Sequence, residues 1–148
     1  YYDESVSPKL LELRAKMMEL LSEDDKLNQI VQLVGEDVLP NDQRVVIEIA
    51  KVLKKGFLQQ NAMHETDSYV PLKKQFEMLK VIDNLYSNSI LAVKEQVALT
   101  KIKNDDLFEE VIKMKYNIPN ENYEKAFEIL NSKINNYYTA LIEENQGE

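Results

Sequence analysis

The chain has 148 residues, which suits a single domain. It carries 26 acidic and 18 basic side chains, and the formal net charge of -8 disfavours nonspecific binding to nucleic acid because phosphates repel an acidic surface. The absence of cysteine and the presence of one histidine, His64, exclude disulfides, thiol nucleophiles and zinc sites rich in cysteine or histidine. The three glycines, Gly35, Gly56 and Gly147, are too far apart for a phosphate-binding loop. No apolar run approaches the roughly 20 residues of a membrane-spanning helix, so we expect no membrane insertion.

Apolar residues at spacings of three and four predict an all-α fold, a bundle of about six helices with short loops. Ser7 and Pro8 supply the start of a first helix, which we expect to end in the low 20s. A second, short helix is expected to end at Gly35, since glycine readily adopts the left-handed conformation that ends helices. Its apolar stripe consists of Leu27, Ile30, Val31 and Val34.

The third helix is expected to follow an acidic turn over residues 36–42, with Asn41 or Asp42 as its N-cap. It should end near residues 57–58, where Gly56 weakens the last turn by about 1 kcal/mol relative to alanine. Residues 59–70 are polar and have no apolar period, which predicts an ordered loop.

Three more helices are expected in the second half of the chain. The first begins at Pro71 and lasts to about residue 96, the next begins near residue 104 and contains Met114, and the last carries an apolar stripe from Tyr123 to Leu141. Residues 143–148 are expected to form an acidic frayed tail. No repeat or low-complexity linker divides the sequence, so we expect residues 1–148 to form a single domain.

Two consecutive segments are more specific than this pattern. Residues 56–69 read Gly-Phe-Leu-Gln-Gln-Asn-Ala-Met-His-Glu-Thr-Asp-Ser-Tyr, and residues 71–80 read Pro-Leu-Lys-Lys-Gln-Phe-Glu-Met-Leu-Lys. Together they resemble the C-terminal helical domain of the catalytic A subunit of archaeal A-type and V-type rotary ATP synthases. The resemblance is strongest over residues 1–95. The family most often has an aromatic residue where this chain has Met63, and often a cysteine at the position of Val70.

The resemblance implies a part of a larger enzyme. The whole subunit would bind ATP or ADP with Mg²⁺ and couple ATP synthesis or hydrolysis to ion transport through rotation. Its partners would be an upstream nucleotide-binding domain, the B subunits of the hexameric head and the central-stalk subunits, in a cytoplasmic, peripheral part of a membrane-bound complex. For the chain alone, which we expect to be an expressed fragment, we expect no catalytic residue, no metal site, no bound cofactor and no ATP hydrolysis.

By the same resemblance, the acidic turn corresponds in position to the DELSEED loop of the related F-type catalytic subunits, which pushes on the rotating shaft. Hydrated carboxylates suit a surface that slides, because exposed ion pairs contribute only about 0–1 kcal/mol each. The residues expected to contact the central stalk are Glu36, Asp37, Val38, Leu39, Asn41 and Asp42. The alternative is an ordinary solvated turn whose acids favour the start of the next helix.

The resemblance also places residues 59–69 over the adenine base of bound nucleotide. An adenine pocket needs flat or polarisable apolar walls and a few polar anchors. The residues expected to contact the adenine end are Phe57, Gln60, Asn61, Ala62, Met63 and Tyr69. The alternative is that the aromatic rings belong to the core and the amides cap helix ends. His64, beside Glu65 and Asp67, is expected to be a structural or surface histidine.

A second function class remains open at this point. The same composition suits a free-standing acidic helical module that binds other proteins. An autonomous enzyme is disfavoured, because the sequence lacks a recognisable catalytic set.

Overall fold

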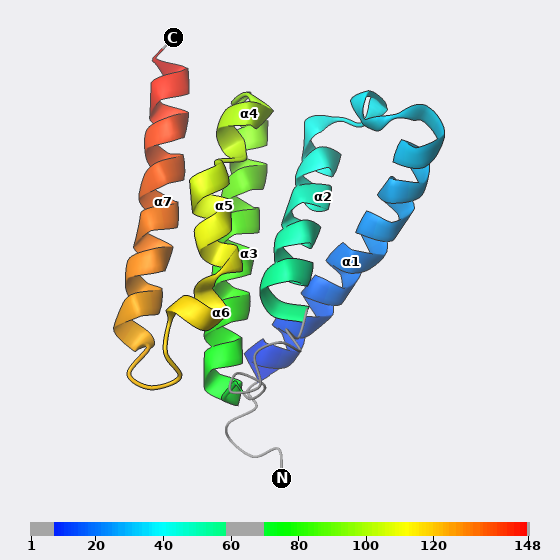
Figure 1. Cartoon of the computed structure of the whole chain (residues 1–148). Helices are drawn as coiled ribbons and strands as arrows, with labels where there is room; N and C mark the ends of the chain where they lie inside the picture. Colours follow the sequence, from blue (N-terminus) through cyan, green and yellow to red (C-terminus); the bar gives the residue numbers. More distant parts are fainter. Residues whose placement is uncertain (1–7, 59–69, 148) are drawn as a thin grey trace.

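The computed structural model describes residues 8–58 and 70–147 of the chain (Figure 1). Within these residues the fold is all-α and contains no strand, which confirms the predicted fold class. The helices are α1 (Pro8–Val34), α2 (Asn41–Leu53), α3 (Leu72–Lys94), α4 (Leu99–Ile102), α5 (Asp105–Ile112), α6 (Met114–Asn117) and α7 (Glu124–Gln146). A 3₁₀ turn, η1 (Glu36–Val38), precedes α2, and a π-helical turn, η2 (Lys54–Leu58), continues it.

The largest difference from the sequence prediction is α1, a single helix of 27 residues where two helices were expected. The expected break contains neither glycine nor proline. Its acidic residue Asp24 lies on the core face, where its carboxylate accepts a hydrogen bond from Lys54 Nζ at 2.7 Å. Because Lys54 pairs with it, the charged side chain of Asp24 can occupy a buried position, and α1 continues through the expected break. The buried face of α1 consists of Leu10, Met17, Leu20, Asp24 and Leu27.

The second half of the chain contains more helical segments than expected. The helix expected near 104 is divided into α5 and α6 by a turn at Lys113, and the short α4 precedes it. Asn104 caps α5, because its Oδ1 accepts from Leu107 N–H at 2.9 Å. α7 continues to Gln146, so residues 143–146 are helical where a frayed tail was expected. Asn145 and Gln146 hold this end by donating to the carbonyl and the carboxylate of Glu95, both at 2.9 Å.

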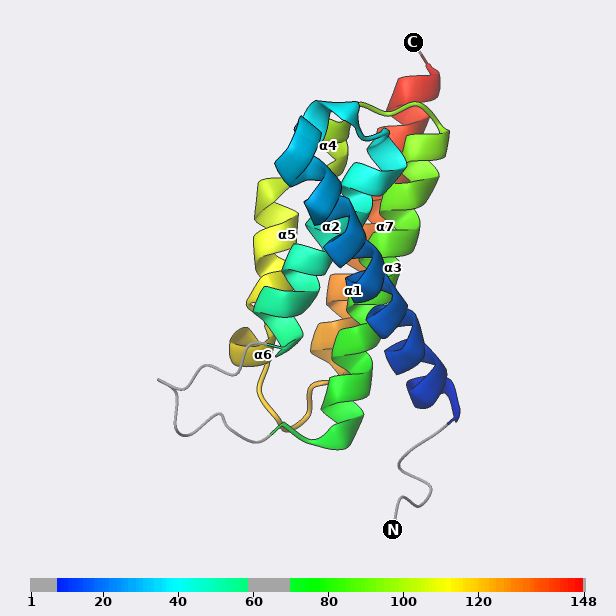
Figure 2. The same cartoon turned by 90° about the vertical axis from the view of Figure 1, so that its right-hand side faces the viewer.

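Helices α2, α3 and α7 lie side by side, and α1 crosses beside α2 at an inclined angle (Figures 1 and 2). α3 contacts α7 and α2 most extensively, and α2 also contacts α1 and α5. The buried apolar side chains of the described helices form one cluster. Residues at the centre of α3, such as Ile82 and Leu85, are fully buried. This packing fixes α2 between two other helices and leaves the turn between α1 and α2 projecting from one end.

Candidate functional site

The first candidate site is the projecting turn between α1 and α2, here called the hairpin tip and defined as residues 30–42. Gly35 ends α1 with φ of 94°, a left-handed conformation that suits glycine, and its N–H donates to Val31 O at 2.8 Å. Pro40 occupies the N-cap of α2, where Asn41 or Asp42 had been expected. Asp42 instead lies in the first turn of α2, where its negative charge is favourable.

The structure places most of the residues expected to contact the central stalk on the surface of the tip. The exposed ones are Glu36, Asp37, Val38, Asn41 and Asp42. Leu39 is only 6% exposed and belongs to the hydrophobic core, so its side chain lies away from any partner. Glu36 is held by Arg44, whose Nη2 lies 3.1 Å from Glu36 Oε1. The acidic character of the tip is therefore partly offset by a neighbouring guanidinium.

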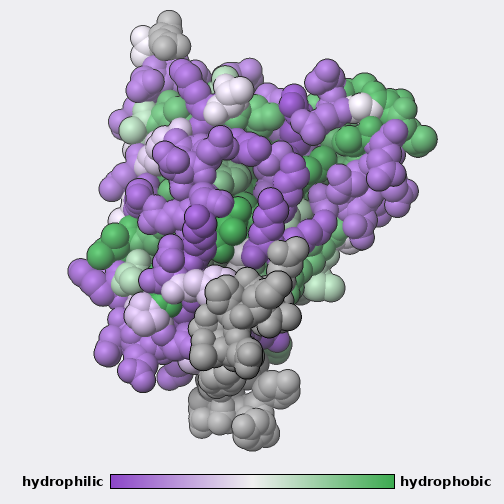
Figure 3. All heavy atoms as spheres, in the orientation of Figure 1, coloured by the Kyte–Doolittle hydropathy of each residue, from purple (hydrophilic) through white to green (hydrophobic). Residues whose placement is uncertain are grey.

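The hairpin tip also carries an apolar surface that the sequence prediction missed. Ile30 and Val34 had been assigned to a packed stripe, yet both are exposed, and Leu33 is 84% exposed. With Val38 they form an exposed group, called the apolar tip patch: Ile30, Leu33, Val34 and Val38. Figure 3 shows hydrophobic residues gathered over this end of α1, at the upper right. The run Ile-Val-Gln-Leu-Val before Gly35 holds more apolar residues than one helix face can bury. This feature of the sequence could have predicted that some of them are exposed.

The second candidate site, the expected adenine contacts, lies mainly outside the described residues. This holds for Gln60, Asn61, Ala62, Met63 and Tyr69, and for the group around His64. Phe57 is described: it belongs to the π-helical turn η2, is half-buried and packs against the core. Single π turns are frequent at functional sites.

The hairpin tip and Phe57, the described residue among the expected adenine contacts, lie at opposite ends of α2. The tip precedes Asn41, and η2 with Phe57 follows Leu53. The 13 residues of α2 span about 20 Å at 1.5 Å per residue. Seven of them are buried: Val45, Val46, Ile47, Ile49, Ala50, Val52 and Leu53. A helix packed this fully resists bending, because close-packed interiors deform little.

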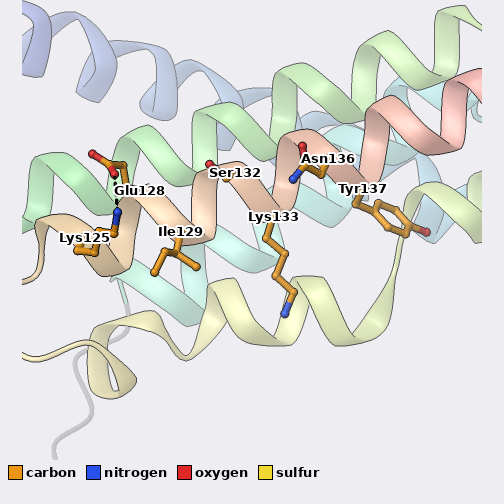
Figure 4. A pocket seen from close by; sticks show the side chains of 7 residues that line it. All are labelled: Lys125, Glu128, Ile129, Ser132, Lys133, Asn136 and Tyr137. Atoms are coloured by element: carbon orange, nitrogen blue, oxygen red, sulfur yellow. Dashed lines mark ion pairs between the residues drawn. The ribbon is translucent and has the colours of Figure 1, made fainter.

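A surface depression on the outer side of α7 was also considered as a site (Figure 4). Its volume is ≈ 660 Å³, and all its lining residues come from α7. Lys133 Nζ lies 2.7 Å from Glu110 Oε1, Lys125 pairs with Glu128, and the Tyr137 hydroxyl donates to Lys101 O. These polar groups already have partners within the protein, so the depression offers no catalytic arrangement.

Two further features limit what the described part of the chain can do. It contains no group of three or more histidine, aspartate or glutamate side chains arranged to hold a metal ion. None of its helices has the length and apolar character that crossing a membrane requires.

Comparison with known proteins identifies the family. A family model described as the C-terminal domain of V and A type ATP synthase matches residues 1–103. The chain belongs to this family. It is 50% identical over 144 residues to the V-type ATP synthase alpha chain 2 of Clostridium tetani, 46% identical over 143 residues to the V-type ATP synthase alpha chain of Halothermothrix orenii, and 38% identical over 144 residues to the A subunit of the A-type ATP synthase of Methanopyrus kandleri. Each match covers 97% of this chain and 24% of the relative.

The resemblance deduced from residues 56–80 is thereby confirmed. The chain spans about a quarter of the length of the curated relatives it matches. The C-terminal domain model of V- and A-type ATP synthases covers α1, α2, α3 and α4, and with them the hairpin tip. Helices α5, α6 and α7 lie beyond residue 103, although the similarity to the relatives extends over nearly the whole chain.

Proposed function

We propose that this domain transmits motion between the nucleotide site of a rotary V/A-type ATP synthase and its central stalk. The observation that carries the proposal is that the hairpin tip and η2, with Phe57, lie at opposite ends of the buried helix α2. A displacement at η2 would reach the hairpin tip with little loss, since α2 contacts both α1 and α3 and seven of its residues are buried.

The surface of the hairpin tip supports contact with a protein partner. The apolar tip patch lies beside exposed Asp37 and Asp42. Apolar side chains provide adhesion through burial, at roughly 25 cal/mol per Å². Exposed carboxylates contribute little binding energy and keep the surface hydrated. We infer that a central-stalk helix with apolar and basic side chains contacts this tip through Glu36, Asp37, Val38, Asn41 and Asp42, together with Leu33.

We further propose that the whole subunit binds ATP or ADP with Mg²⁺, with residues 57–69 at the adenine end. The described residues do not fit the Mg²⁺ ion, because they hold no cluster of three or more histidine, aspartate or glutamate side chains arranged to bind a metal. Of the residues expected to contact the adenine base, only Phe57 lies in the described part of the chain, and it is half-buried. In this proposal the upstream nucleotide-binding domain, which the family resemblance implies, holds the phosphates and Mg²⁺. The B subunits would complete the head, a peripheral part of a membrane-bound complex on its cytoplasmic side.

The test uses the full-length protein in its assembled complex. The double variant Leu33→Ser and Val38→Ser removes two exposed members of the apolar tip patch, one before and one after Gly35. We expect central-stalk binding to weaken about tenfold or more, since two apolar anchors are lost, and ATP-driven ion transport to fall while ATP hydrolysis by the head persists. Ile129→Ser is the matched control, because this residue is 58% exposed on α7, away from the tip.

The proposal is overturned if stalk affinity and ion transport equal those of the control both in this apolar variant and in a charge variant of the tip. A separate triple variant, Glu36→Gln, Asp37→Asn and Asp42→Asn, examines the carboxylates alone. Retained coupling in this variant, with lost coupling in the apolar one, would assign the contact to the apolar tip patch. Lost coupling in the charge variant alone would assign it to electrostatics.

A further inference from the structure

The chain on both sides of the expected adenine-contacting segment is attached to one short region, residues 112–120. Residues 59–69 lie between η2 and α3 in the sequence, so η2 and the start of α3 determine where that segment begins and ends. Both attachments are made by described residues.

The first attachment is a close backbone approach at Gly56, in η2. A Cβ added at Gly56 would lie 3.1 Å from Ile112 Cα and 3.2 Å from Ile112 O. These are main-chain atoms at the C-terminal end of α5, and they cannot rotate away as a side chain can. Gly56 is buried in this contact, so only glycine lets η2 lie this close to α5.

The second attachment is Lys74, in the first turn of α3. Its side chain is 0% exposed, and Nζ donates to Lys115 O at 2.9 Å, to Asn120 Oδ1 at 2.8 Å and to Ile118 O. Carbonyls at the end of a helix lack partners within the helix, and a cation placed there is favourable. Lys74 thus joins the start of α3 to the end of α6 and the turn that follows it.

Two further hydrogen bonds involve the chain that directly follows the segment. Gln75 Nε2 donates to Val70 O at 2.8 Å, and Arg14 Nη2 from α1 donates to Gln75 Oε1 at 3.2 Å. Val70 is the first described residue after the segment. Its carbonyl is therefore fixed to α3, and α3 is fixed to residues 115–120 through Lys74.

We propose that residues 112–120, called the platform, position the adenine-contacting segment by holding both of its ends. Gly56 and Lys74 are its positioning residues, and neither touches nucleotide. This inference rests on the proposed function, which places residues 57–69 at the adenine end of bound nucleotide. It assigns a role to a region beyond residues 1–103, the part matched by the family model.

The platform makes a specific kinetic prediction. If the segment is displaced, its contacts with the adenine base weaken equally in the bound substrate and in the transition state. Such a loss raises KM and leaves kcat unchanged. A merely structural role would instead lower the yield of assembled complex, or lower kcat, without a selective change in KM. The KM-against-kcat comparison therefore separates positioning from folding.

The experiment measures steady-state ATP hydrolysis by the complete complex carrying Gly56→Ala or Lys74→Met. We expect KM for ATP to rise about tenfold, with kcat within about twofold of the unsubstituted complex. Gly147→Ala is the matched glycine control, because a Cβ there would meet only Glu143 O and Glu144 O, each at 3.6 Å. Lys73→Met is the matched lysine control, an exposed neighbour of Lys74. Both controls should keep the original KM.

A milder variant covers the case in which Lys74→Met prevents assembly. Asn120→Ala removes one oxygen acceptor from Lys74 at an exposed position, and we expect KM to rise about threefold.

Met63→Ala separates the two proposals. If it raises KM while Gly56→Ala and Asn120→Ala do not, the platform is overturned and the adenine contact stands. If none of the three raises KM, the adenine contact is overturned as well. A rise in KM for the platform variants alone supports the platform and assigns the base contact to other residues of the segment.

Discussion

Two buried charged residues, Asp24 and Lys74, each join two helical segments of the domain. Asp24 on α1 is 1% exposed and accepts a hydrogen bond from Lys54, which follows α2. Lys74 on α3 donates to oxygen atoms of residues 115–120. A buried charge is tolerated where its partners replace water, and removing those partners is more costly than removing the pair together. Both residues therefore fix the relative position of neighbouring helices.

Tyr138 is the residue whose ionisation links most directly to stability. It is fully buried on α7, its hydroxyl donates to Ile102 O at 2.6 Å, and burial raises its pKa to about 12. The folded state therefore keeps the proton at a pH where the unfolded chain, with a pKa near 10.0, has lost it. The resulting stabilisation is fully present below about pH 10 and is lost as pH rises to about 12.

We expect the free energy of unfolding to fall by about 1.4 kcal/mol per pH unit over this range because of Tyr138 alone. Urea unfolding at a series of alkaline pH values measures it, and the Tyr138→Phe variant should lack this component. Tyr116→Phe, at an exposed position, should retain the full fall. Parallel pH profiles for the two variants would contradict the assignment.

At the scale of elements, α1 has two functionally distinct parts. Its buried stripe ends at Leu27, and its last turn exposes Leu33 and Val34 beside Gly35. α1 and α2 are antiparallel neighbours, as their short connection requires, but the two helices diverge toward the hairpin tip (Figure 1), where the last turn of α1 is exposed. The apolar tip patch is thus a consequence of one continuous helix whose last turn leans away from α2.

The two parts of α1 should respond differently to truncation of leucine. Leu27→Ala should lower the free energy of unfolding by about 2–4 kcal/mol, because a cavity forms where the side chain is 2% exposed. Leu33→Ala should change it by less than about 0.5 kcal/mol, because that side chain is already in water. Chemical denaturation of both variants measures the difference, and equal losses would place Leu33 in the core.

At the scale of the whole molecule, α3 is the central element. It contacts α1, α2, α4 and α7, and its middle residues Val81, Ile82 and Leu85 are fully buried. On its outer side, Asn84 and Asn88 donate to Asn131 and Asn135 of α7 at 3.1 and 3.2 Å. These paired amides add a fixed register to the apolar contact between α3 and α7.

We expect the amides of central α3 to exchange with solvent most slowly of all, because only global unfolding exposes them. Amides of η1 at the hairpin tip should exchange at least about 100 times faster, since no residue of η1 is buried. Native-state hydrogen exchange of the domain measures both. Greater protection in α1 than in central α3 would contradict this hierarchy.

The local sequence determined much of this protein. Helical periodicity predicted the all-α class, Gly35 and Pro40 predicted the turn before α2, and residues 56–80 identified the family, because each depends on neighbouring residues alone. Other features depended on tertiary contacts. Asp24 continues α1 only because Lys54 lies opposite it, and Gly56 matters because the backbone of Ile112 approaches it from a distant part of the chain. The exposure of Leu33 followed from how α1 and α2 diverge at the tip, which no local pattern records.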